Sequence, residues 1–356
     1  MIFYTGSYTQ MGSPAPDPKG QGIGCFNLDA KSGKVELLHY TKQRNPSYLA
    51  ISNDKKYLYA IEEMYEQLNP EIFSYRIEND GKLSLINTQK LIGDYACHLA
   101  IIKDRLLVAN YMSGNVLSFP ILKDGSLMKH HQLIQHAGTG PNTERQEAAH
   151  AHMVYPFCEN QVFIVDLGID TARSYRWDET IMRWEADPNM DIQTDSGAGA
   201  RHMVMCGTED LVYVLSELAG DVFVFKKQGS KFNQIQKISF IPERYSGDFG
   251  GAAIRLHPNG HFLYVSCRGS DSIAVFKIND DPKTLSLVAQ ESSGGKTPRD
   301  FNIDPTGNWL VVANQDSDAL VVFEIDQEKG ILKKRSAISA ETPVNICWLA
   351  QEENKI

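Results

Sequence analysis

Residues 254–260 read IRLHPNG, and residues 301–307 read FNIDPTG. An apolar run follows each heptapeptide, FLYV at residues 262–265 and WLVV at residues 309–312. A polar turn then leads to a third segment, IAVF or LVVF, whose β-branched and aromatic residues favour strands. The two stretches are therefore copies of one repeat, in which short strands alternate with turns.

The same repeat can be followed along the whole chain. Counterparts of Phe301, which we call the landmarks of the repeat together with Phe301, stand at Leu49, Leu99, Met153, Met203, Ile254 and Ile346. These positions are 45 to 54 residues apart, and no long segment between them has a helical period. Seven copies of four short strands with this period are typical of a β-propeller. We therefore expect residues 1–356 to form one all-β domain, a seven-bladed β-propeller, although length alone would suggest two or three domains.

The two ends of the chain complement each other. The last copy, at residues 343–348, supplies an inner strand without outer strands after it. The N-terminus supplies strand-like segments at residues 2–5, 24–28 and 35–38 without an inner strand. Pairing of the C-terminal inner strand with these N-terminal strands would close the ring and remove its exposed edges. Residues 10–21, rich in Gly, Ser and Pro, are expected to form a loop inserted into this blade.

Composition excludes several classes of protein. The 35 Lys and Arg against 44 Asp and Glu give a net charge of −9, whereas binding to nucleic-acid phosphates requires a basic face. No apolar run approaches the roughly 18 residues of a membrane helix, and the first residues lack the basic start of a secretory signal. The six cysteines form no C-x-x-C pair. We expect a cytoplasmic protein with free thiols, without nucleic-acid or membrane partners; its oligomeric state stays open, a monomer included.

The repeat also predicts where a functional site lies. The innermost strands of a propeller line a central channel, and the loops that enter them share a face with the loops that leave the second strands. The residues just before each landmark should point around this mouth, and they include His98, His152, His202 and Asp300. The neighbouring positions add Arg201, Arg299, Asp166, Glu217 and Arg268. Such a group of His, Arg and carboxylate side chains can bind an anion and move a proton.

Metal and cofactor sites are not indicated. His150 and His152 share one side of a strand, and with His202 and Asp166 they could imitate a His-rich metal site. Their spacing matches no zinc module, so we expect no metal. The glycine-rich residues 20–24 lead into a strand rather than a helix, and the sequence has neither a G-x-S-x-G elbow nor a P-loop. We therefore expect no organic cofactor.

At this point the residues match a known family. Residues 138–152, GTGPNTERQEAAHAH, resemble the G-x-G-P-N-x-x-R-Q-E-x-x-H-A-H stretch of the lactonase family of seven-bladed propellers. That family includes propeller-type 6-phosphogluconolactonases and 3-carboxy-cis,cis-muconate cyclases. Further matches are GSYT at 6–9, VDLGID at 165–170, ARHM at 200–203, SEL at 216–218, LYVSCRG at 263–269 and PRDF at 298–301. The chain departs from the family at Cys267, where Asn is expected, and in the long loop of residues 10–21.

The resemblance implies a catalytic set and a substrate. The set is His152, Arg201, Glu217 and Arg268, acting without metal or organic cofactor. The implied substrate is a small anionic sugar lactone such as 6-phosphogluconolactone. Arginines would hold its phosphate or polarise its carbonyl, and His152, Glu217 or His202 would take a proton from the attacking water. Further candidates for substrate binding are His98, Arg145, Glu147, His150, Asp166, His202, Arg299 and Asp300.

Several alternatives stay open. Arg145 and Glu147 would either close over the ligand or form an ion pair that shapes their loop. A muconate-type cyclase could use the same His, Glu and Arg set, and a lactonase could take a different anionic lactone. A propeller can also be a scaffold without catalysis, because fold does not imply function. The charged mouth argues against a scaffold, which would more naturally display aromatic or apolar patches.

Overall fold

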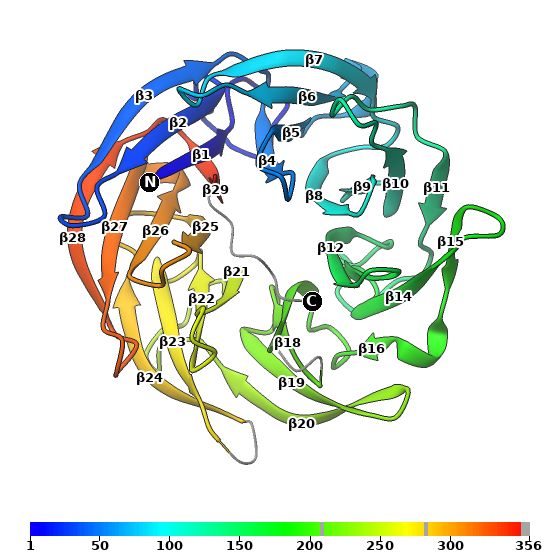
Figure 1. Ribbon diagram of the computed structural model, residues 1–356. Helices are drawn as coiled ribbons and strands as arrows, with labels where there is room; N and C mark the ends of the chain where they lie inside the picture. The colour runs from blue at the N-terminus through cyan, green and yellow to red at the C-terminus, as the bar shows by residue number, and fades with distance from the viewer. Residues whose placement is uncertain (207–209, 281–283, 350–356) are drawn as a thin grey trace.

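Seven antiparallel sheets stand around a common axis in a computed structural model that describes residues 1–206, 210–280 and 284–349 (Figure 1). Each sheet has four strands in a row, and one carries the short extra strand β16 (Ile192–Gln193) beside β14. This arrangement confirms the predicted seven-bladed β-propeller. In each blade the first strand of the repeat lies innermost and the fourth lies at the rim of the ring.

Four blades are formed by the closing sheet and the N-terminal half. The closing blade contains β29 (Pro343–Trp348), β1 (Ile2–Ser7), β2 (Ile23–Leu28) and β3 (Val35–Thr41). The next contains β4 (Pro46–Ile51), β5 (Tyr57–Glu62), β6 (Glu71–Ile77) and β7 (Leu83–Lys90). The third contains β8 (Ala96–Ile102), β9 (Arg105–Asn110), β10 (Asn115–Pro120) and β11 (Gln132–Gln135). The fourth contains β12 (Ala151–Cys158), β13 (Gln161–Asp166), β14 (Thr171–Asp178) and β15 (Arg183–Ala186).

The C-terminal half forms the other three blades. The first contains β17 (Ala200–Cys206), β18 (Leu211–Ser216), β19 (Asp221–Gln228) and β20 (Lys231–Ser239). The second contains β21 (Gly251–Leu256), β22 (Phe262–Cys267), β23 (Ser272–Ile278) and β24 (Leu285–Ser292). The third contains β25 (Pro298–Ile303), β26 (Trp309–Asn314), β27 (Ala319–Ile325) and β28 (Leu332–Ser339).

In residues 1–206, 210–280 and 284–349, helical structure is confined to the 3-10 turns η1 (Glu66–Leu68), η2 (Pro188–Met190) and η3 (Gln315–Ser317). None of the helices in those ranges has the length and apolar character to cross a membrane. The absence of a long segment of helical period in the sequence likewise indicated an all-β fold.

The ring closes as the two chain ends predicted. β29 pairs antiparallel with β1, placing Trp348 opposite Phe3, and β1 continues into β2. The rings of Phe3 and Trp348 lie 4.9 Å apart, and both side chains are buried in the cluster shared with β26. Residues 10–21 lie between β1 and β2, in agreement with the predicted loop. Closure therefore joins residues more than 300 positions apart through a ladder and a packed aromatic pair.

A bulge at the start of every innermost strand orients the mouth of the channel. In each pairing of an innermost strand with its neighbour, the register shifts within the first residues. A bulge leaves one residue outside the ladder and re-aims its side chain. The residues skipped in this way include Cys97, His152, Arg201, Arg299 and Val344.

A repeated hydrogen bond locks these bulges. Directly before six of the seven innermost strands stands a residue with a left-handed backbone. In all seven blades the residue preceding the innermost strand accepts a hydrogen bond, 2.7 to 3.2 Å long, from the backbone N–H that follows the second strand. The donors are Tyr8, Glu63, Tyr111, Leu167, Glu217, Arg268 and Gln315. Each blade therefore presents two side chains at the mouth from fixed backbone positions.

Strand register corrects one landmark of the sequence analysis. In the β8, β17 and β25 blades the landmark lies three residues after the first paired residue of the inner strand. In the β12 blade that first residue is Ala151, so the counterpart of Phe301 is Val154 and not Met153. The prediction that His152 occupies the same position of the repeat as His98 and His202 was therefore wrong. His152 is instead a bulged residue, equivalent to Arg201 and Arg299.

Removal of the Trp348 side chain should destabilise the closed ring. Trp348 is 2% exposed, and its replacement leaves a cavity against Phe3, so we expect Trp348→Ala to cost about 3–5 kcal/mol in the free energy of unfolding. Urea unfolding followed by fluorescence or circular dichroism measures it. Leu85→Ala, at a side chain 57% exposed on β7, is the control and should change stability by less than about 0.5 kcal/mol. Equal effects of the two substitutions would contradict this account of closure.

Candidate active site

A cleft of about 310 Å³ opens where the bulged residues and the residues after the second strands meet. This volume lies at the lower end of the roughly 300–1,000 Å³ found for small-molecule sites. Bulged residues in the lining are Cys97, His152, Arg201 and Arg299, and residues after second strands are Glu63, Tyr111, Glu217 and Arg268. The loops add Pro14, Tyr65, Tyr95, Met112 and Arg145.

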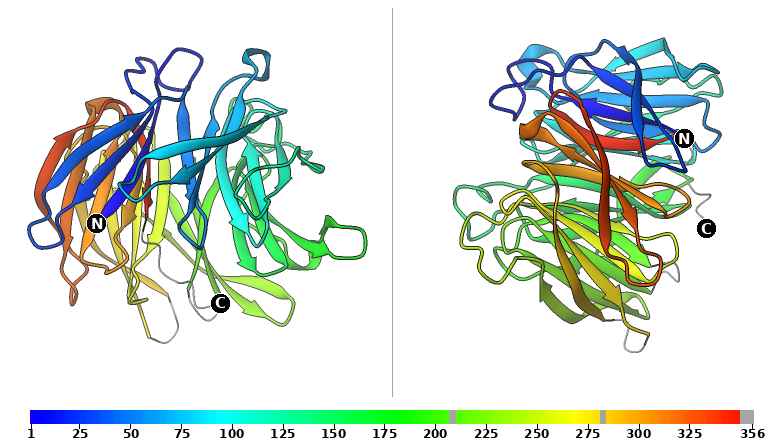
Figure 2. Two further views of the ribbon diagram at one scale, coloured as in Figure 1. Left: turned by 45° about the horizontal axis from the view of Figure 1, so that its top comes forward. Right: turned by 90° about the vertical axis from the view of Figure 1, so that its left-hand side faces the viewer.

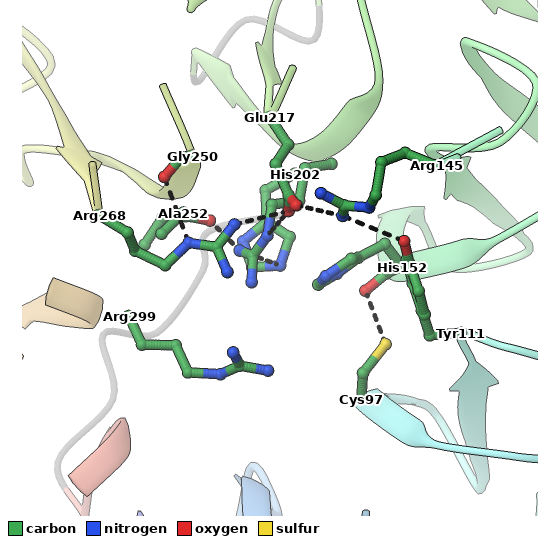
Figure 3. A network of polar contacts seen from close by, with 12 residues as sticks. Cys97, Tyr111, Arg145, His152, His202, Glu217, Gly250, Ala252, Arg268 and Arg299 are labelled. Carbon is green, nitrogen blue, oxygen red and sulfur yellow. Dashed lines mark hydrogen bonds and ion pairs between the residues drawn. The ribbon is translucent and has the colours of Figure 1, made fainter. Parts of the chain in front are cut away.

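Glu217 is the centre of a charged network in this cleft (Figure 3). Its Oε2 lies 2.9 Å from Arg201 Nε and 2.9 Å from Arg268 Nη2, and its Oε1 lies 2.5 Å from Arg145 Nη2. Arg145 Nη2 also donates to the Tyr111 hydroxyl at 3.2 Å. Burial raises the pKa of Glu217, but the arginines outweigh it and hold that pKa well below its usual value. Both carboxylate oxygens of Glu217 therefore already contact arginines, and Glu217 is a weak base.

Backbone carbonyls fix two of the arginines from behind. Arg201 donates through Nη1 to the carbonyl of Ala252, and Arg268 donates through Nε to the carbonyl of Gly250 at 3.2 Å. Burial and the neighbouring Arg268 lower the pKa of Arg201 to about 10, which still leaves it cationic at neutral pH. These two guanidinium groups are held in place before any ligand arrives.

Arg299 belongs to a second, looser ion pair. Its Nη2 lies 3.5 Å from Glu63 Oε1, the longest of the arginine–glutamate contacts in the cleft. The Tyr8 hydroxyl donates to Glu63 Oε2 at 2.7 Å, and the Arg299 guanidinium lies over the Tyr8 ring at 5.2 Å. Figure 3 shows this guanidinium extending toward the space between Arg268 and His152. Arg299 therefore offers donors that the protein itself uses less fully.

His152 is the imidazole that lines the cleft. It is buried, and its Nδ1 has no hydrogen-bond partner among the residues that the structure describes. Burial and the cation of Arg201 lower the pKa of His152 well below 6.5, against the opposing effect of Glu217. The ring is therefore neutral at pH 7, and a neutral imidazole can accept a proton.

Below the cleft the channel narrows to a hollow of about 10 Å³, close to the space one water requires. His202 and Asp300 line this hollow. The His202 ring lies 5.2 Å from that of His152, and its Nε2 lies 3.4 Å from Arg201 Nη1. Asp300 accepts from Arg255 Nη2 at 2.8 Å, so its charge is compensated below the cleft. Both residues reach a ligand only at the bottom of the site.

The cleft carries an excess of positive charge. Its lining contains four arginines against two glutamates, a net charge of about two positive, although the whole chain has a net charge of −9. A locally positive concave surface concentrates anions even on an acidic protein. The geometry therefore favours an anionic ligand.

Most of the predicted site residues meet in this cleft or its hollow. His152, Arg201, Glu217, Arg268, Arg145 and Arg299 line the cleft, and His202 and Asp300 line the hollow. His98, Glu147, His150 and Asp166 line neither. His98 lies beside Tyr48, with ring centres 4.2 Å apart, and its Nδ1 accepts from the backbone N–H of Val154 at 3.4 Å.

The other three outlying residues hold the loop that carries Arg145. Asp166 accepts from His136 Nδ1 at 2.7 Å and from the backbone N–H of His150 at 2.7 Å. The His150 ring stacks on Tyr111 at 4.6 Å, and its Nε2 lies 3.1 Å from Glu147 Oε1. Arg145 pairs with Glu217 and Glu147 with His150, which corrects the suggested Arg145–Glu147 ion pair. Their positions favour support of the cleft over contact with its ligand.

Sequence reasoning passed over several residues of the cleft. Cys97, Glu63 and Tyr111 stood at the same repeat positions as the chosen candidates, but only the His and Arg residues, Glu217, Asp166 and Asp300 were selected there. Pro14, Tyr65 and Met112 come from loops between repeat strands, where the repeat gives no register. Tyr95 stands directly before β8, at a position of the repeat from which no candidate was chosen. Within the described ranges, no group of three or more His, Cys, Asp or Glu side chains has the geometry to hold a metal ion.

The lowered pKa of His152 gives a direct test of this electrostatic description. Because burial and Arg201 oppose protonation, the imidazole should stay neutral as the pH falls through 6.5 in the ligand-free protein. Nitrogen-15 NMR of the imidazole nitrogens, assigned with His152→Gln, measures the protonation state, with free histidine in the same buffer as reference. A midpoint at or above 6.5 would contradict the electrostatic environment described for the cleft.

Comparison with known proteins gives the same picture. The model of the family "Lactonase, 7-bladed beta-propeller" matches residues 2–348. The chain is 36% identical over 307 residues to the 6-phosphogluconolactonase of Bacillus subtilis, covering 84% of each protein. The structure of the periplasmic gluconolactonase of Pseudomonas aeruginosa superposes with a TM-score of 0.89 at 28% identity, covering 97% of this chain and 98% of that one. A structure of a Lactobacillus plantarum protein gives 0.87 at 28% identity, with the same coverage. The chain belongs to the lactonase family of seven-bladed β-propellers.

Proposed function

We propose that this protein hydrolyses an anionic sugar lactone, with 6-phosphogluconolactone as the best-fitting substrate. The observation that carries the proposal is a positively charged cleft of four arginines beside a neutral imidazole with an unused nitrogen. The similarity to proteins named 6-phosphogluconolactonase and gluconolactonase supports the reaction class. A cytoplasmic location, expected from the sequence, stays a prediction.

The phosphate would bind at Arg299. Its guanidinium makes the longest ion pair of the cleft, so it loses the least when it turns its donors to a ligand. Guanidinium groups pair with phosphate oxygens through two parallel hydrogen bonds. Glu63 and Tyr8 hold this guanidinium in the lining of the cleft, where the phosphate arm of a ligand could reach it.

His152 is the best-placed base of the three candidates. Glu217 already accepts from three arginines, so a proton transfer to it would weaken all three contacts. His202 lies in the hollow, with Nε2 facing the Arg201 cation. His152 lines the cleft, and its buried Nδ1 has no hydrogen-bond partner among the described residues. General-base catalysis by a positioned imidazole contributes roughly 10²–10⁴-fold to rate.

The reaction needs no covalent intermediate. Water would attack the lactone carbonyl while His152 takes its proton, and the oxyanion would form next to Arg201 and Arg268. Preorganised donors of this kind stabilise a developing oxyanion by about 3–4 kcal/mol each. When the bond between the carbonyl carbon and the ring oxygen breaks, the imidazolium would return the proton to that oxygen. The product is the open-chain acid, which ionises in water.

Loss of the base should lower turnover far more than affinity. We expect His152→Gln to reduce kcat for 6-phosphogluconolactone by roughly 10²–10⁴-fold with a small change in KM, because the amide cannot take the proton. Steady-state assays above the spontaneous opening rate measure this. Arg335→Gln, on the exposed outer strand β28, is the matched control and should keep wild-type kinetics. A well-folded wild type without lactone hydrolysis would refute the proposed function.

Arg299 should discriminate phosphorylated from neutral lactones. Loss of a charge-assisted hydrogen bond corresponds to roughly a 10- to 100-fold weaker interaction. We therefore expect Arg299→Gln to raise KM for 6-phosphogluconolactone by this factor and to change KM for glucono-1,5-lactone little. Equal changes for both lactones would show that Arg299 does not hold the phosphate.

A further inference from the structure

The lining of the cleft combines a charged set of side chains with an aromatic and apolar set, which we call the second wall. The arginines and His152 belong to the charged set, and the proposed reaction uses only these groups. Loop residues Pro14, Tyr65, Tyr95 and Met112, together with Tyr111, contribute aromatic and apolar surface to the same lining. A phosphate site alone does not require such surface, so the second wall calls for its own explanation.

Two tyrosines of this wall form a ring pair. The ring centres of Tyr65 and Tyr95 lie 4.5 Å apart, with their planes at 72°, an edge-to-face arrangement. Tyr65 precedes η1 and is 41% exposed, whereas Tyr95 precedes β8 and is half-buried. An edge-to-face pair leaves ring faces available for a ligand, and the face of an aromatic ring is its electron-rich side.

The pair is preorganised by bonds between the two loops. The backbone N–H of Glu66 donates to Asp94 Oδ1 at 2.6 Å, and the backbone N–H of Gly93 donates to Glu66 Oε2 at 2.9 Å. A ligand would therefore find the rings already placed. Figure 2 shows the β1–β2 loop and the η1 turn projecting on the same side of the ring, and a Cβ built on Gly12 would lie 3.1 Å from Leu68 Cδ1. The β1–β2 loop, which contains Pro14, thus packs beside this wall.

Tyr95 stands at a strained backbone position. Its φ is 54°, in the left-handed region that bulky residues rarely adopt. Other blades place Asn45, Gly199, Gly250 or Thr297 before their innermost strands, residues that are smaller or glycine. The Tyr95 ring packs on Tyr65 and also lines the cleft. A ring in the cleft at an energetic cost points to use by a ligand.

We propose that the Tyr65–Tyr95 pair is a subsite for the C–H face of the sugar ring. The inference rests on the proposed function and extends it to the part of the substrate that carries no charge. The C–H bonds on one face of a pyranose are weakly positive and pack on the electron-rich faces of aromatic rings. The tyrosines would therefore select a cyclic, anionic sugar over a bare anion.

Two probes separate the ring subsite from the anion site. Glucose 6-phosphate carries a pyranose ring and a phosphate but no lactone, and inorganic phosphate carries no ring. Calorimetric titration gives the affinity of each, so the readout does not depend on turnover. We expect the wild type to bind glucose 6-phosphate more tightly than phosphate. Tyr65→Ala and Tyr95→Gly should each weaken glucose 6-phosphate binding roughly three- to tenfold, with phosphate binding unchanged.

Control variants test whether the aromatic ring itself is required and whether the substituted protein is still folded. Tyr65→Phe and Tyr95→Phe retain the aromatic face and should keep the preference for glucose 6-phosphate. Glycine accepts a left-handed backbone, so Tyr95→Gly should remain folded, which thermal unfolding checks. An unchanged preference in Tyr65→Ala and Tyr95→Gly would overturn the subsite. A wild type that binds both probes equally would also overturn it while leaving the anion site intact, and a wild type that binds neither would refute the anion site itself.

Discussion

The hydrogen bond between the end of each second strand and the residue before each innermost strand determines the site. It occurs in all seven blades, and the bulge beside it excludes one residue from the ladder. Each blade therefore places side chains at the mouth without depending on loop length. The chemistry of the mouth then depends on which residues occupy those positions, and Arg201 and Glu217 are neighbours because one such junction carries both.

Four arginines in one cleft are costly unless their charges find partners. The protein meets this need with two glutamates and with backbone carbonyls, including those of Ala252 and Gly250. Glu217 serves three of the arginines, and Glu63 serves Arg299 through a longer contact. The compensation is incomplete, so part of the positive charge is left for a ligand. This imbalance distinguishes a binding cleft from a purely structural ion-pair network.

The repeat in the sequence predicted the fold and much of the site for one reason. The junction between strands has the same geometry in each blade, so the position of a residue in the repeat determines where its side chain points. The pairing of β29 with β1 and the meeting of Arg201, Arg299 and Glu217 therefore followed from spacing. The β12 blade was the exception, because its pairing begins at Ala151 and its landmark therefore lies one residue later than the sequence indicated. His152 thus occupies the bulged position of the repeat. Pro14 and Tyr65 could not be predicted, since they lie in loops whose lengths the repeat does not specify. Tyr95 stands at a fixed position of the repeat, directly before β8, but most other blades have smaller residues or glycine there, so the pattern did not point to a ring. Asp166 shows a further limit, because its partner His136 comes from outside the repeat columns.

The positive charges that would bind an anionic substrate also affect the pKa of the proposed base, His152. Without a ligand, burial and the arginines keep His152 neutral and weakly basic. A phosphate bound at Arg299 would offset part of this positive field. Opposite unit charges 4 Å apart interact by about 4 kcal/mol at an effective dielectric constant of 20, whereas one pKa unit corresponds to about 1.36 kcal/mol. Burial, the largest cause of the lowered pKa of His152, would remain, but even a fraction of that interaction would raise this pKa from its ligand-free value. The proposed base would therefore be stronger when an anionic substrate fills the site.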